Sequence, residues 1–181
     1  MTYKFENFCA ECRDSLIADN GPAGREAIVG HLEKLLADEE FVQEKLGPDQ
    51  PPGRRTIYED PDAGFCVLFH NYDRKGGGTP HDHGDSWAVY GQAREFTDIK
   101  EFNRLDDGSD DDQAELEVSR EFRMNSGKAA LFDTGVIHSI NFIPGGRVVR
   151  VTGTDLDKIP KWRFDLKNKK ALLWLEGASG Q

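Results

Sequence analysis

The chain has 181 residues and a formal net charge of −10, because its 33 acidic residues outnumber its 23 basic ones. Such an acidic protein repels nucleic-acid phosphates and anionic lipid surfaces, so we expect neither a nucleic acid nor a membrane as a partner. The length fits a single structural domain with a sizeable core.

The sequence has no sign of export or membrane insertion. No apolar run approaches the roughly 20 residues of a membrane-spanning helix. Residues 1–6 lack the basic end and the apolar stretch of a signal peptide. We therefore expect a cytoplasmic protein, in which an odd number of cysteines, three, is not arranged as a disulfide framework.

The first third of the chain has the pattern of helices. After the start signal Gly21-Pro22, apolar residues recur at helical spacing at Ile28, Val29, Leu32, Leu35 and Leu36. Cys9 and Cys12 also fall at helical spacing among apolar residues, so we interpret them as small core residues. Gly47-Pro48 and residues 51–53 end this pattern, which predicts a small helical cap over residues 1–50.

From residue 51 onward the pattern changes to short β-rich runs. These runs are residues 56–59, 65–70, 86–94, 115–124, 128–133, 136–142 and 147–152. Several are apolar on both faces, as expected of barrel strands that also carry a helical cover. We expect a mainly β protein with a barrel over residues 51–165 and a tail over residues 166–181 that packs on the barrel, all in one structural domain.

Three histidines are the candidate metal ligands. His81 and His83 are two residues apart, so on an extended backbone their side chains point to the same face. His138 ends a glycine-framed segment, residues 127–138. Three neutral imidazoles suit Fe(II), Zn(II), Ni(II), Cu(II) or Mn(II), and affinity order alone does not choose among these metals. No glutamate closely follows the His-x-His pair, so a zinc hydrolase with a general base is less favoured.

The segments that carry these histidines resemble the two motifs of the cupin superfamily. Residues 76–83 read Gly-Gly-Gly-Thr-Pro-His-Asp-His, like the first motif, and residues 127–138 are spaced like the second. The usual glutamate of the first motif is missing, since Trp87 and Ala88 stand where it would fall. The resemblance implies a cupin double-stranded β-helix, or jelly-roll barrel, with His81, His83 and His138 as the ligands of one metal.

Within the cupins, residues 81–87 and 53–56 resemble cysteine dioxygenase and the bacterial thiol dioxygenases, over roughly residues 50–157. This resemblance implies Fe(II) as the cofactor and the addition of both atoms of O₂ to a thiol sulfur, which gives a sulfinic acid. Two features depart from that group. Ala88 replaces the cysteine that is cross-linked to a tyrosine, and residues 150–154 lack the group's Ser-x-His-x-Tyr series.

The family's substrate-binding arginine falls on Ile57, so Arg55 and Arg150 are the alternative candidates for binding an anionic substrate. A salt bridge to an acidic side chain is an equally good interpretation of each. Tyr90 and Gln92 could hydrogen-bond around the ligands, although strand parity counted from His83 points them away from the metal.

The predicted function is therefore a mononuclear non-haem iron dioxygenase that uses O₂ on a small anionic substrate, most simply a thiol. Two alternatives remain open. One is carbon–carbon cleavage of a diketone by a three-histidine iron site, and the other is a non-catalytic cupin that binds a metal or a metabolite.

Overall fold

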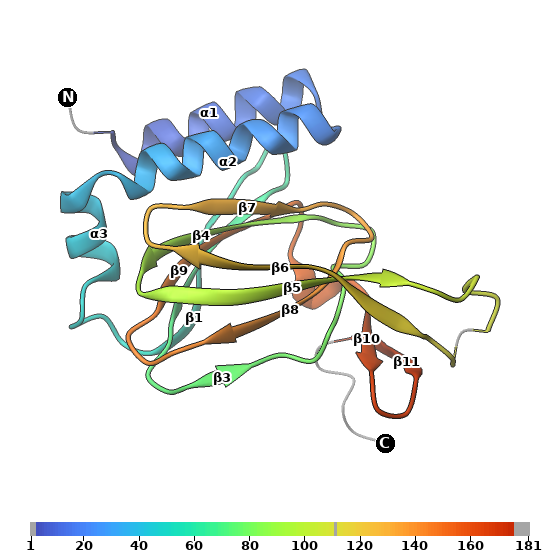
Figure 1. Ribbon diagram of the computed structural model, residues 1–181. Coiled ribbons are helices and arrows are strands. Elements are labelled where there is room, and N and C mark those ends of the chain that lie inside the picture. The colour runs from blue at the N-terminus through green and yellow to red at the C-terminus, as the bar shows by residue number, and fades with distance from the viewer. Residues whose placement is uncertain (1–2, 111, 176–181) are drawn as a thin grey trace.

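The computed structural model describes residues 3–110 and 112–175. The helical cap that the sequence predicts is formed by α1 (Phe5–Ala18), α2 (Pro22–Leu36) and α3 (Glu39–Leu46). Helices α1 and α2 lie side by side across the larger sheet of the barrel, and α2 contacts strands β4 and β7 (Figure 1). No helix among the described residues is long and apolar enough to cross a membrane.

Two antiparallel sheets form the barrel. The larger sheet has the order β1-β2-β9-β4-β7, with bounds β1 (Gly53–Glu59), β2 (Cys66–Asn71), β9 (Arg147–Thr152), β4 (Ala88–Arg94) and β7 (Ala129–Phe132). The smaller sheet has the order β3-β8-β5-β6, with bounds β3 (Gly76–Gly77), β8 (Ile137–Phe142), β5 (Phe96–Arg104) and β6 (Leu116–Asn125).

The pairing of these strands is nested. Strand β5 pairs with β6, β4 with β7, β3 with β8 and β2 with β9, as in one long hairpin. Winding this hairpin into a barrel also brings β4 beside β9 and β5 beside β8. Such a wound hairpin is a double-stranded β-helix. The predicted fold class, a mainly β barrel of this kind with an N-terminal helical cap, is confirmed.

The larger sheet is buried on both faces along its central strands β2, β9 and β4, which explains their apolar character. Its outer face, which includes Val67 and Phe69 of β2, forms one core with the helices. Its inner face forms a second core inside the barrel, which includes Ala88, Tyr90 and Val148. The three cysteines are buried and free, and Cys9 and Cys12 belong to the core beneath the helices. Burial raises the pKa of Cys9 to about 12, so these thiols serve packing.

Some of the strands were not predicted from the sequence. Strand β5 has apolar residues at every third position, Phe96, Ile99 and Phe102, which is not a strand pattern, and it was not predicted. The predicted packed tail begins at residue 166, but strands β10 (Lys161–Asp165) and β11 (Lys170–Trp174) form an antiparallel hairpin after a short helix, η1 (Leu156–Lys158). The hairpin lies on the far side of the barrel from helices α1 and α2 (Figure 1).

The position of the hairpin can be compared with the predicted domain boundaries. The predicted boundary between residues 165 and 166 falls within this hairpin, between its two strands. Residues 176–181 of the predicted tail and residues 1–2 of the predicted cap lie outside the described residues.

We expect Gly91→Ala to destabilise the protein. A Cβ atom at Gly91 would lie 2.6 Å from the Cδ2 atom of Leu32, a fully buried side chain of α2. Overpacking of this kind costs about 1–3 kcal/mol, measurable as the free energy of unfolding in urea. The matched control is Gly30→Ala on the same helix, where no atom lies within 4 Å of the added Cβ. Higher helix propensity makes that change neutral or stabilising by up to ~1 kcal/mol. Equal effects at the two glycines would contradict the close approach.

Candidate metal centre

The barrel brings His81, His83 and His138 together. His81 precedes β4, while His138 lies in β8. The backbone N–H of each of these two residues donates to the carbonyl of the other, both at 2.9 Å. The ring centroids of His138 lie 4.6 Å from His81 and 4.8 Å from His83. One ligand atom from each of the three residues lies within 4.8 Å of the other two, which is close enough to hold one metal ion.

A tight turn and a buried carboxylate position His83. The next residue, Gly84, has a φ of +60°, and a Cβ there would lie 2.2 Å from the carbonyl oxygen of Pro160. Only glycine fits this turn without strain. Asp82 is buried, and its carboxylate accepts hydrogen bonds from the N–H groups of Gly84 (3.0 Å) and Trp162 (2.8 Å). The histidine segment is therefore fastened to the β10–β11 hairpin.

The three imidazoles are held in the neutral form. Burial is the main cause that lowers the pKa of His81 and holds the pKa values of His83 and His138 well below the usual 6.5. The neighbouring histidines and the positive charge of Arg150 act in the same direction. Neutral imidazoles are the form that binds a metal, so little proton competition is expected at pH 7.

Hydrogen bonding orients these rings and leaves nitrogen atoms unused. The Nδ1 of His81 lies 2.9 Å from the carbonyl of Thr79, and that of His138 lies 3.5 Å from the carbonyl of Val136. A carbonyl only accepts, so each Nδ1 carries the proton and each Nε2 keeps a lone pair. The Nε2 of His138 and the Nδ1 of His83 are buried without a hydrogen-bond partner. Buried polar atoms are normally satisfied, so these residues fit a bound metal ion.

Two aromatic side chains surround the histidines from inside the barrel. The Phe132 ring stacks on His138 with centroids 4.1 Å apart. The Tyr90 hydroxyl lies 3.2 Å from the Nε2 of His83. Counting strand parity from His83 pointed Tyr90 away from the site, and this was wrong because the turn at Gly84 interrupts the strand. Gln92 instead accepts a hydrogen bond from the Thr97 hydroxyl at 2.8 Å.

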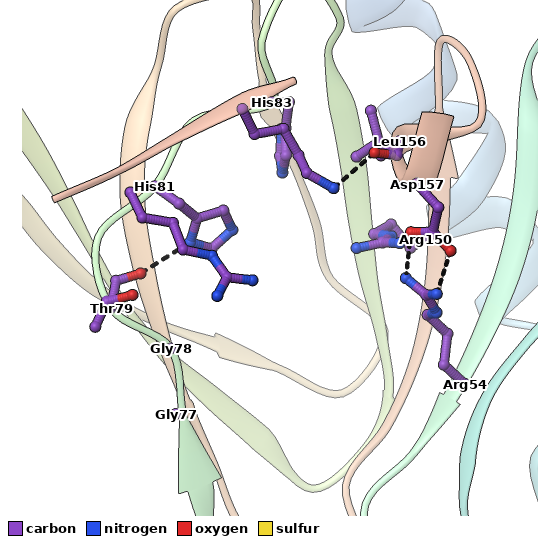
Figure 2. A pocket seen from close by; sticks show the side chains of 11 residues that line it. Arg54, Gly77, Gly78, Thr79, His81, His83, Arg150, Leu156 and Asp157 are labelled. Atoms are coloured by element: carbon purple, nitrogen blue, oxygen red, sulfur yellow. Dashed lines mark hydrogen bonds and ion pairs between the residues drawn. The ribbon is translucent and has the colours of Figure 1, made fainter. Parts of the chain in front are cut away.

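A pocket of about 490 Å³ opens beside the histidines (Figure 2). Its lining includes His81, His83 and the four cationic residues Arg54, Arg150, Lys161 and Arg163. Among the described residues, Asp157 is the single carboxylate of this lining. Figure 2 shows the ion pair between Arg54 and Asp157 across the pocket from His81 and His83. The pocket is therefore cationic in a protein whose net charge is −10.

The two candidate arginines lie in different places. Arg150, on β9, lines the pocket, but Arg55 is not among its lining residues. Neighbouring side chains of a strand point to opposite faces. Arg54 therefore faces the pocket, while the guanidinium of Arg55 donates to the Oε1 of Gln50 at 3.3 Å. Sequence reasoning missed Arg54, Lys161 and Arg163, although Arg54 lies next to a candidate that it did select.

Comparisons with known proteins found only solved structures of low similarity. No family model matches the chain, and no curated protein matches it either. Three similar solved structures are KdgF from Halomonas sp., oxalate oxidase in complex with glycolate, and the cupin domain of Schizosaccharomyces pombe Cnp3. Their sequence identities to the chain are 15%, 14% and 12%, and their TM-scores are 0.41, 0.39 and 0.43, respectively. The matches cover 55%, 59% and 60% of this chain and 74%, 53% and 66% of the respective partners. The matched region thus spans about half of the oxalate oxidase chain.

We expect the metal-free protein to lose stability as the pH falls below about 6.5. The pKa values of the three histidines, and of the buried His70 ring, are lower in the folded than in the unfolded chain. Above pH 6.5 both states are neutral, whereas below it the unfolded chain takes up protons that the folded protein excludes. Each such histidine then lowers the free energy of unfolding by up to about 1.4 kcal/mol per pH unit.

The measurement is urea unfolding of metal-free protein at several pH values between 5 and 8. The variant His138→Leu removes one histidine that takes up a proton only in the unfolded chain, so the stability of the variant should depend less steeply on pH. An equal slope in the two proteins would show that His138 is not held neutral.

Proposed function

We propose that the protein is a mononuclear non-haem iron(II) dioxygenase that oxidises a small anionic thiol to its sulfinic acid. The observation that carries this proposal is a cluster of three neutral imidazoles, two of them buried, beside a cationic pocket. His81, His83 and His138 would hold the metal. Iron(II), when bound there, would supply the redox chemistry with O₂. Three neutral ligands bring no negative charge, so the site favours an anionic substrate.

The protein's own residues bind and orient the reactants. The carbonyls of Thr79 and Val136 fix the ring orientations of His81 and His138 through Nδ1. Phe132 covers one face of His138 and keeps water from it. Arg150 would bind an acidic group of the substrate, since a guanidinium can donate two parallel hydrogen bonds to a carboxylate. Its positive charge would also favour the thiolate, the reactive form of a thiol.

The charge of the pocket separates this proposal from its alternatives. A neutral diketone would bind best in an apolar pocket, whereas the lining here contains three arginines and a lysine. A protein that only binds a metabolite would use the same anion-binding side chains without consuming oxygen. Oxygen uptake therefore distinguishes a thiol dioxygenase from a binding protein, and the preferred substrate distinguishes it from a diketone-cleaving enzyme.

The test of this proposal is oxygen uptake by protein loaded with iron(II) under anaerobic conditions, across a panel of small thiols and diketones. We expect uptake with an acidic thiol and formation of its sulfinate. His138→Gln should lose both bound iron and uptake, whereas the matched control His31→Gln, on helix α2, should keep both. No uptake with any compound at full iron occupancy would rule out the dioxygenase. Uptake with diketones alone would favour carbon–carbon cleavage.

Replacing Arg150 by glutamine should mainly weaken substrate binding. Loss of a hydrogen bond to a charged group costs about 1.5–3 kcal/mol, so KM should rise about ten- to a hundredfold. The control Arg123→Gln removes an exposed arginine of β6 that pairs with Asp98. It should leave KM unchanged. If Arg150 instead serves stability alone, its replacement would lower the free energy of unfolding and leave KM as it is.

A further inference from the structure

Two arginines that lack a carboxylate partner line the pocket from separate elements. Arg150 comes from β9 of the barrel wall and Arg163 from β10 of the C-terminal hairpin. In residues 3–110 and 112–175, no acidic side chain forms an ion pair with either of them. Arg54 differs, because Asp157 already neutralises it within the same pocket. The chain has ten more acidic than basic residues, so acidic partners are not scarce in the sequence.

Arg150 is placed to meet an anion inside the pocket. Its Nε atom is buried without a hydrogen-bond partner, and its guanidinium lies 5.9 Å from the centre of the Tyr90 ring, which contacts His83. An unpaired guanidinium in such a place is costly unless a ligand supplies acceptors. This arginine therefore lies beside the aromatic ring that contacts one of the three histidines.

Arg163 is held at the mouth of the pocket. It is exposed to solvent, and its guanidinium stacks on the Trp174 ring at 3.8 Å from the ring centre. Its backbone forms a β-bridge with His81. The stacking leaves the N–H groups at the guanidinium edge able to bind a carboxylate. The two unpaired arginines thus offer two anion-binding groups, from separate elements, in the lining of the pocket that also contains His81 and His83.

We propose that the substrate is a thiol with two carboxylates, one bound by Arg150 inside the pocket and the second bound by Arg163 at the mouth. This inference rests on the proposed function and assigns Arg163 as a specificity-determining residue. The size of the pocket agrees with it. A water occupies about 30 Å³ of liquid, so a pocket of about 490 Å³ has room for more than a two- or three-carbon acid.

The test uses binding of unreactive acids, so that it does not depend on turnover. Succinate and butyrate share a four-carbon chain and differ by one carboxylate. Isothermal titration of metal-loaded protein under anaerobic conditions should show succinate binding at least tenfold more tightly than butyrate. Arg163→Gln should lower succinate affinity about tenfold and leave butyrate affinity unchanged, whereas Arg163→Lys should keep most of the preference.

The matched control is Arg120→Gln, which removes an arginine of β6 that also stacks on an aromatic ring, with its guanidinium carbon 4.3 Å from the centre of Phe122. It should change neither affinity, because Arg120 is not among the residues that line this pocket. Equal affinities for the two acids, no binding of either, or an equal loss of both in Arg163→Gln would overturn the proposal. Iron content and oxygen uptake with an acidic thiol, measured on the same samples, test the proposed function separately.

Discussion

The pair of backbone hydrogen bonds between His81 and His138 is the contact on which the whole site depends. These residues are more than fifty positions apart in the sequence, and the reciprocal bonds at 2.9 Å bring their rings within 4.6 Å of each other. His83 is brought into the same site because the chain turns at Gly84. The β10–β11 hairpin is held beside the site because Asp82 and the neighbouring backbone bind it. A metal at this position would add a second link between the same two segments of the chain, one made through side chains.

Charge is distributed unevenly in this protein. The surface is acidic on average, yet the pocket gathers arginines from β1, β9 and β10 around imidazoles that burial keeps neutral. The local field therefore attracts an anion into a protein that repels anions at long range. The same field keeps protons off the histidines, so the features that favour an anionic ligand also favour a metal. Arg54 is the exception, because Asp157 holds and neutralises it.

Much of this arrangement could be predicted from the sequence, because it depends on local spacing. The helical stripe at Ile28 and Leu32 predicts the cap, and the apolar runs predict the barrel. The two histidine motifs predict the three-histidine cluster that the structure brings together. Pairing between distant segments could not be predicted. Nothing local shows that Arg163 forms a bridge to His81. Tyr90 was misplaced because one glycine turn ends the alternation of the strand. Arg54 and Arg55 are indistinguishable until the face of β1 is known.

The nested pairing of the strands influences the order in which the protein folds. The β5–β6 hairpin closes between neighbours in the sequence, whereas β2 and β9 meet across most of the barrel. Loop closure costs more entropy as the separation grows, so topologies of this kind fold slowly and build outward from local pairs. His81 and His138 belong to the outer part of this nest. We therefore expect that the newly made chain acquires a complete metal site only late in folding. The metal ion would then bind to a barrel that is already nearly closed.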